Sequence, residues 1–189
     1  MEELERFVLS GPCAGIALEP AFDPVPWQVD DERVFPLYER CQEAGVPVAF
    51  TYGGIFTPGL RYYQPLPMDR VAELFPRLRI ALCHGGWPFV TEFCEIAFNR
   101  GNVWLAPDMY MIGAPGSQEY VLAANGILYD RMLFGSAAPI ISIADAERAY
   151  RQCGVRAERL PFLMEGNARN FLGIEAAVPE DGAGETARA

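Results

Sequence analysis

The chain has 189 residues, of which 51% are hydrophobic and 21% are charged, a balance typical of a folded domain rather than of a disordered polypeptide. Its formal net charge of -10 disfavours nucleic acids and anionic membrane surfaces as partners, because both would repel it. A small molecule or another protein is therefore the expected partner.

The five cysteines are odd in number, form no Cys-x-x-Cys pair and mostly lie in apolar runs. This usage is typical of reduced thiols in a cytosol. We identify no signal peptide and no apolar run long enough to span a bilayer. The sequence predicts a soluble, cytoplasmic protein.

Short apolar runs followed by Gly, Pro or Asp predict five strands. They cover residues 14–19, 46–51, 79–84, 103–106 and 131–136. Helical patterns lie at residues 2–9, 36–44, 68–75, 90–98, 117–124 and 143–153, and a last helix is expected to start at Asn167 as its cap and to end near Gly173. Strands that alternate with helices imply βαβ units and a parallel sheet. The expected domain covers residues 1–175, and residues 176–189, which lack apolar periodicity, are expected to form a loose tail.

The one histidine of the chain, His84, ends the third predicted strand and precedes a Gly-Gly-Trp-Pro loop. Ligands bind at the carboxyl ends of parallel strands in α/β proteins, so His84 is a candidate functional residue. One histidine cannot build a zinc site, which normally takes three protein ligands.

The sequence contains, in this order, the fragments FPLYERC at residues 35–41, GVPVAFTYG at 45–53, HGGWP at 84–88, FGSAAP at 134–139 and NARNFLG at 167–173. Together they resemble the amidohydrolase superfamily, in its amidohydrolase-2 branch of metal-dependent hydrolases and aromatic-acid decarboxylases. The resemblance covers roughly residues 2–174 and begins just before the fourth strand of the family's barrel. It implies an α/β fold, an incomplete TIM-like (β/α) barrel of about five parallel strands that corresponds to the C-terminal part of the barrel.

The resemblance also implies which site residues are retained. Members hold a divalent metal with a His-x-His pair on the first strand, a histidine that ends the fifth and an aspartate that ends the eighth. The fifth-strand histidine falls on Thr51 and the eighth-strand aspartate falls on Ala137. Only His84 matches, at the position of a sixth-strand histidine that often serves as catalytic acid or base. We therefore expect no bound metal and no cofactor.

Each candidate side chain has two interpretations. His84 is either a general acid/base, assisted by Asp108 or Glu19, or a hydrogen-bonded relic. A Cys83–His84 dyad is disfavoured, because successive residues of a strand point to opposite faces. Candidates for substrate binding share a position at or after a strand end, and the aromatic ones serve equally well as packing residues. They are Glu19, Thr51, Tyr52, Trp87, Tyr110 and Ser136.

Two functional hypotheses stay open. The first is an amidohydrolase-related enzyme that acts on a small carboxylated or aromatic substrate by metal-independent acid/base chemistry. The second is a pseudoenzyme that serves as a binding or scaffolding subunit. In both cases five strands of a barrel leave open edges, so we expect a homodimer or a partner chain that completes the barrel.

Overall fold

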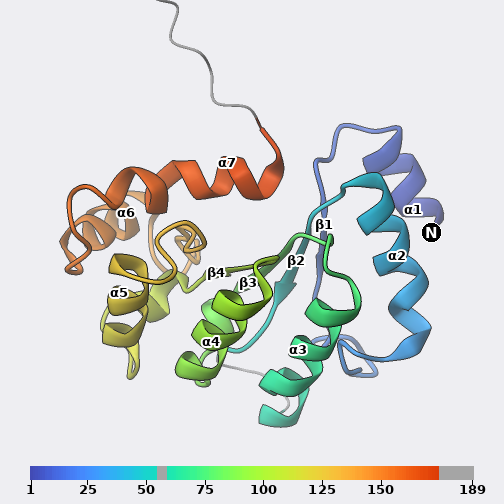
Figure 1. Cartoon of the computed structure of the whole chain (residues 1–189), viewed down its shortest axis with the longest axis horizontal. Coiled ribbons are helices and arrows are strands. Elements are labelled where there is room, and N and C mark those ends of the chain that lie inside the picture. The colour runs from blue at the N-terminus through green and yellow to red at the C-terminus, as the bar shows by residue number, and fades with distance from the viewer. Residues whose placement is uncertain (55–58, 175–189) are drawn as a thin grey trace, which may run out of the picture.

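The computed structural model describes residues 1–54 and 59–174 and contains a four-stranded parallel sheet with strand order β1-β2-β3-β4 (Figure 1). The strands are β1 (Ile16–Leu18), β2 (Val48–Thr51), β3 (Ile80–Cys83) and β4 (Val103–Ala106). Each strand pairs with the next one along the chain, and Phe50 of β2 lies between Leu18 and Leu82. All four strands therefore end at the same edge of the sheet.

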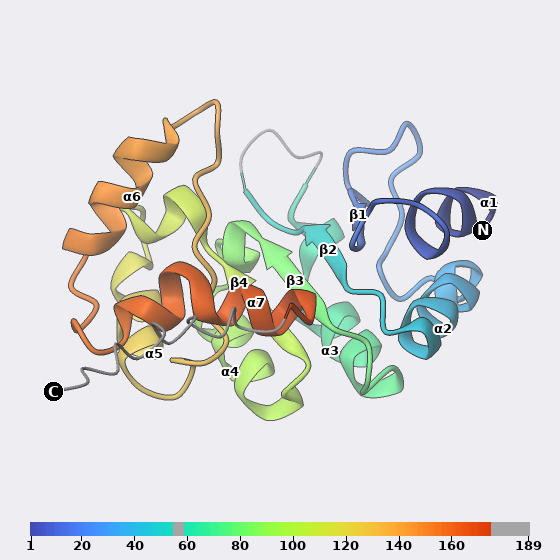
Figure 2. The ribbon, with the colours of Figure 1, turned by 90° about the horizontal axis from the view of Figure 1, so that it is seen from above.

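A helix follows each strand. These helices are α2 (Phe35–Ala44), α3 (Pro65–Leu74), α4 (Val90–Arg100) and α5 (Ser117–Asn125). Figures 1 and 2 show α2, α3 and α4 in succession along one side of the sheet. Sequential strand order with the helices on one side is the arrangement of a barrel wall, whereas a doubly wound sheet has helices on both faces. The prediction of an α/β fold with an incomplete TIM-like barrel is confirmed.

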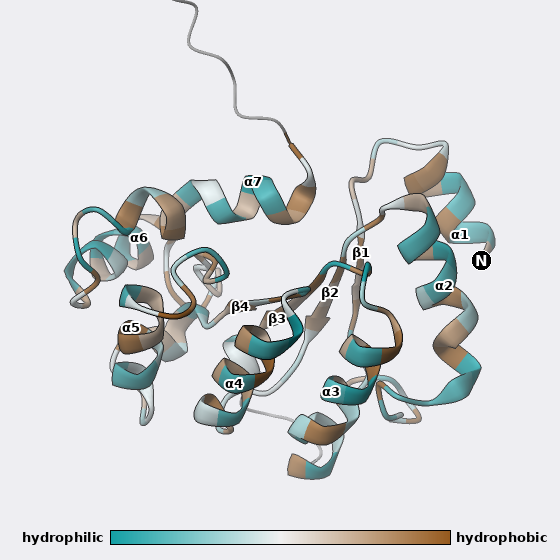
Figure 3. Cartoon of the chain, viewed as in Figure 1, coloured by the Kyte–Doolittle hydropathy of each residue, from teal (hydrophilic) through white to brown (hydrophobic). Residues whose placement is uncertain are grey.

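The two faces of the sheet differ in burial. Alternate strand residues such as Val48, Phe50 and Leu82 are completely buried against the helices, and Figure 3 shows the apolar strands between helices of mixed hydropathy. The intervening residues are small or only partly buried, and the helix α7 (Asn167–Leu172) contacts this second face. Its Phe171 ring lies 5.6 Å from that of Trp104, measured between centroids. The second face is the one that would point into a closed barrel.

The fifth predicted strand is reduced to a single parallel bridge between Leu105 and Met132. The amide of Leu133 still donates to the carbonyl of Leu105 at 2.8 Å. The next bond of the ladder would need an N–H at Pro107, which has none. The prediction of a strand over residues 131–136 is therefore wrong after Leu133.

Helix positions agree with the sequence patterns to within a few residues. The N-terminal helix comprises α1 (Glu2–Leu4) and a π-helical turn over Glu5–Leu9, and α6 covers Ile143–Gln152. Asn167 is not a helix cap as predicted. It is the first residue of α7, it is buried, and its side-chain amide donates to the carbonyls of Tyr129 at 2.9 Å and Met132 at 2.8 Å.

No helix within the described ranges combines the length and the apolar character needed to cross a membrane. The predicted tail over residues 176–189 lies outside the described residues.

Candidate functional site

His84 and Asp108 meet at the carboxyl edge of the sheet, each in a short 3-10 turn that follows its strand. His84 begins the turn His84–Gly86 after β3, and Asp108 begins the turn Asp108–Met111 after β4. The Oδ2 atom of Asp108 lies 2.6 Å from His84 Nδ1. It also accepts a hydrogen bond from the backbone amide of His84 at 3.0 Å. A carboxylate only accepts hydrogen bonds, so Nδ1 carries the hydrogen of the neutral imidazole and Nε2 presents its lone pair.

The pair is buried at the carboxylate and accessible at the imidazole. The side chain of His84 is 25% exposed, whereas that of Asp108 is 7% exposed. Asp108 Oδ1 is buried and has no hydrogen-bond partner among the described residues. Within the same residues no hydrogen bond involves His84 Nε2. The arrangement fixes one nitrogen of the ring and leaves the other free to exchange a proton with a bound molecule.

Three residues other than glycine adopt positive φ angles in the described part of the chain, and all three follow the sheet at this edge. They are His84 at 65°, Asp108 at 46° and Ala137 at 53°. Such a conformation costs about 1 kcal/mol or more for a residue with a Cβ and tends to occur at functional sites. At His84 and Asp108 this conformation starts the two turns in which their side chains meet.

Aromatic side chains lie beside the imidazole. The ring of Tyr110 packs edge-on against His84 with 5.6 Å between centroids, and Trp87 stacks on Tyr110 at 4.9 Å. The indole nitrogen of Trp87 donates to the carbonyl of Pro115 at 2.9 Å, which fixes the ring. Gly54 also lies against these rings, because a Cβ there would lie 2.9 Å from His84 Cδ2 and 3.2 Å from the Tyr110 hydroxyl.

The other predicted residues are not all at this site. Thr51 donates to Glu19 Oε1 at 3.1 Å, so these two form a separate pair on the second face of the sheet. Ser136 accepts from the amide of Ala138 at 3.2 Å and lies next to Gly135, whose backbone packs against Asp108.

Tyr52 was expected to bind substrate, and the structure places it elsewhere. Its side chain is completely buried on the helix side of the sheet, and its hydroxyl donates to the carbonyl of Gln64 at 2.9 Å. Strand alternation explains the difference, because Tyr52 continues the buried series of Val48 and Phe50.

Cys83 lies in register with Thr51, on the second face of the sheet. Burial, with a smaller contribution from the negative charge of Asp108, raises the pKa of the Cys83 thiol to about 11. The thiolate is the nucleophilic form of cysteine, so this residue is mostly protonated and unreactive at neutral pH. It is not arranged as the partner of His84.

The residues of this chain do not fit the divalent-metal site that the family resemblance implies. At the fifth-strand position the hydroxyl of Thr51 is engaged with Glu19, and at the eighth-strand position Ala137 offers only a methyl group. Within residues 1–54 and 59–174, no three His, Cys, Asp or Glu side chains are grouped so that they could hold an ion. The described residues therefore lack the donor groups with which the family holds its metal.

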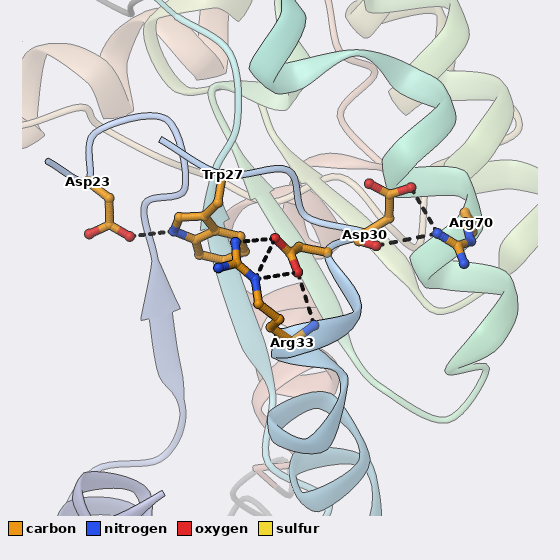
Figure 4. Close-up of polar contacts among 6 residues, drawn as sticks. Asp23, Trp27, Asp30, Arg33 and Arg70 are labelled. Carbon is orange, nitrogen blue, oxygen red and sulfur yellow. Dashed lines mark hydrogen bonds and ion pairs between the residues drawn. The ribbon is translucent and has the colours of Figure 1, made fainter. Parts of the chain in front are cut away.

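A separate cleft of about 600 Å³ lies over the loop that follows β1, lined by aromatic, aliphatic and charged side chains. They are Val25, Pro26, Trp27, Gln28, Asp31, Arg33, Val34 and Tyr62. Figure 4 shows how polar contacts brace this loop: Asp23 accepts from Trp27, Arg33 pairs with Asp31 at 2.6 Å, and Arg70 of α3 reaches Asp30 at 3.3 Å. Neither His84 nor Asp108 lines this cleft.

Two buried tyrosines that the sequence did not single out support the turns of the site. Tyr120 donates to the carbonyl of Gly85 at 3.2 Å, and Tyr150 donates to the carbonyl of Asp108 at 3.0 Å. Both lie on helical patterns where an aromatic residue indicates only core packing, so no sequence signal distinguishes them.

Residues 1–174 match the family model described as amidohydrolase. No protein of curated function matches the chain. Among solved structures, an uncharacterised TIM-barrel protein from Bordetella bronchiseptica is 36% identical, with a TM-score of 0.84 over 92% of this chain and 60% of that one. This chain therefore spans about 60% of the length of that relative.

More distant structures share the fold. The 2,6-dihydroxybenzoate decarboxylase from Rhizobium is 17% identical, with a TM-score of 0.61 over 80% of this chain and 58% of that one. The 5-carboxyvanillate decarboxylase from Sphingomonas paucimobilis is 15% identical, with a TM-score of 0.62 over 86% of this chain and 59% of that one.

Proposed function

This chain belongs to the amidohydrolase family, and we propose that it is an enzyme in which His84 and Asp108 carry out acid/base chemistry on a small carboxylated or aromatic substrate. The observation that carries the proposal is the 2.6 Å contact between His84 Nδ1 and Asp108 Oδ2, on a partly exposed ring whose Nε2 makes no hydrogen bond to the described residues. Histidine side chains in general exchange protons near neutral pH.

In the proposed mechanism Nε2 of His84 gives a proton to the substrate or takes one from it. Asp108 holds the ring through Nδ1 and stabilises the positive charge that develops when both nitrogens are protonated. Acid/base catalysis of this kind contributes about 10² to 10⁴-fold to a rate. That is enough for an isomerisation, dehydration or cyclisation of a reactive compound, and it is little for the hydrolysis of an amide.

A decarboxylation shows how the atoms balance. The imidazole first takes a proton from solvent at Nε2. It then donates this proton to the ring carbon that bears the carboxylate, the carbon–carbon bond breaks, CO2 leaves, and the proton takes the place of the carboxylate. The stacked rings of Trp87 and Tyr110 beside His84 supply a flat apolar surface against which an aromatic substrate packs.

The neighbours in structure suggest the first compounds to test. Purified protein would be incubated with 2,6-dihydroxybenzoate and 5-carboxyvanillate, the compounds in the names of two decarboxylases of this fold. Their consumption and the release of CO2 would be followed with and without a chelator. Turnover that survives the chelator and requires His84 supports the proposal, and turnover that the chelator abolishes contradicts the metal-independent part of it.

A second candidate function is that of a binding or scaffolding subunit without catalysis. The observation that favours it is the loss of donor groups at Thr51 and Ala137, where the resembling enzymes have metal ligands. A tight complex with one of the same compounds, formed without turnover, would distinguish it from the first.

A further inference from the structure

The His84–Asp108 pair depends on two strained turns, and each turn is held from outside by one buried hydroxyl. In the first turn His84, Gly85 and Gly86 all have positive φ angles, of 65°, 61° and 82°. In the second, Asp108 has a φ of 46°. A chain relaxes out of such conformations unless surrounding contacts hold it in place.

The hydroxyl of Tyr120, from α5, donates to the carbonyl of Gly85 in the first turn at 3.2 Å. It also fills the space beside that glycine, since a Cβ on Gly85 would lie 2.8 Å from the hydroxyl oxygen and 3.1 Å from Pro107 Cα. The first turn is therefore packed between Tyr120 and the residue that precedes Asp108.

The hydroxyl of Tyr150, from α6, donates to the backbone carbonyl of Asp108 at 3.0 Å. The segment after Met132 lies close to the same turn, because a Cβ on Gly135 would lie 3.1 Å from Asp108 Cβ. Phe134 packs edge-on against the Tyr150 ring with 5.0 Å between centroids. Tyr150 thus joins the turn after β4 to the segment that leads to Ala137.

Both tyrosines are completely buried. Burial, with the nearby Asp108 charge as a lesser cause, raises the pKa of each hydroxyl well above its usual value. Each hydroxyl therefore stays protonated and keeps donating over the whole physiological pH range.

We propose that Tyr120 and Tyr150 are positioning residues that hold His84 and Asp108 in the geometry of their contact. Neither hydroxyl is bonded to the imidazole or the carboxylate, so each acts through a backbone carbonyl. The role of the pair in catalysis rests on the proposed function, whereas the positioning itself is a property of the folded protein and needs no substrate.

The test uses the fact that the chain has a single histidine. In ¹⁵N-labelled full-length protein, the imidazole signals belong to His84 without further assignment and report whether Nδ1 is protonated and hydrogen-bonded. Tyr150→Phe and Tyr120→Phe each remove one hydroxyl. The matched control is Tyr38→Phe, because Tyr38 is equally buried and donates to the carbonyl of Val29 at 3.0 Å, between α2 and the loop that precedes it.

We expect the Nδ1 proton signal to shift or to be lost by exchange in Tyr150→Phe and in Tyr120→Phe, and to stay in place in Tyr38→Phe. Unchanged His84 signals in folded Tyr150→Phe and Tyr120→Phe would overturn the proposal. Failure of both variants to fold, when Tyr38→Phe folds, would also overturn it, because the hydroxyls would then support the fold as a whole. If the signals shift but His84→Asn retains full turnover, the positioning stands and the proposed function fails.

Discussion

Asp108 Oδ2 accepts two hydrogen bonds from the same residue, His84, one from the ring nitrogen Nδ1 and one from the backbone amide. The double contact fixes both the position of the turn and the orientation of the ring. It joins the ends of two neighbouring strands, β3 and β4, across 24 residues of sequence. A site of this kind is held by the scaffold rather than by a mobile loop.

Asp108→Asn tests the contribution of the carboxylate charge. Asparagine tolerates positive φ angles better than most residues, so the turn is expected to persist. We expect turnover to fall by about 10²-fold or more, because the neutral amide no longer stabilises a protonated imidazole. Activity close to that of the wild type would show that the carboxylate only shapes the turn.

The protein is expected to bind no stoichiometric zinc, manganese or iron. A catalytic zinc normally takes three protein ligands, and Thr51 and Ala137 supply none at the two positions that the family resemblance indicates. Elemental analysis after dialysis checks this. A content close to one metal ion per chain would refute the prediction.

Thiol labelling tests the environment of Cys83. Because its pKa is raised to about 11, the thiolate fraction at pH 7 to 8 is far below that of an ordinary cysteine and increases only toward pH 11. Mass spectrometry of native protein treated with iodoacetamide should find Cys13, which is exposed, modified well before Cys83. Rapid modification of Cys83 at pH 7 in folded protein would contradict the raised pKa of its partly buried thiol.

Asn167→Ala is expected to destabilise the fold by about 1 to 3 kcal/mol, because it leaves the buried carbonyl of Met132 and the partly buried carbonyl of Tyr129 without their donor. The matched control is Asn170→Ala, on the same helix but exposed, for which a change within about 0.5 kcal/mol is expected. Urea denaturation measures both, and equal effects would argue against a specific role of the Asn167 amide.

We also propose that the purified chain associates through the open side of its sheet. In the described residues β1 has no neighbour on its outer side, Ala17 is exposed, and the buried indole nitrogen of Trp104 lacks a partner. A homodimer or a partner chain would cover this region, with a buried area above about 2,000 Å². Light scattering that gave a monodisperse folded monomer of 20.9 kDa would contradict it.

Much of the fold followed from local sequence signals. Pro36 lies in the first turn of α2, and Gly45, with a φ of 67°, ends it, as the pattern predicted. The strand predicted over residues 131–136 is wrong after Leu133, because Pro107 on the neighbouring segment has no N–H to extend the ladder. Strand alternation could place Tyr52 in the core, but it gives no information on His84, which lies past the end of β3 in a left-handed conformation.

The candidate site was predictable as residues but not as a geometry. His84 and Asp108 could each be recognised as polar groups at strand ends. Their contact depends on positive φ angles at both positions, which no residue type in the sequence demands. The supporting hydroxyls of Tyr120 and Tyr150 come from helices whose patterns indicate packing alone.

In the proposed reaction His84 exchanges the proton with the substrate. The most direct test of this role is a paired measurement of turnover and melting temperature on His84→Asn, with a substrate found among the aromatic carboxylates. A side chain that is 25% exposed at the edge of the sheet contributes little to packing. We expect turnover to be abolished while the melting temperature stays within a few degrees of the wild type. Retained turnover together with a large fall in melting temperature would show that the histidine is structural.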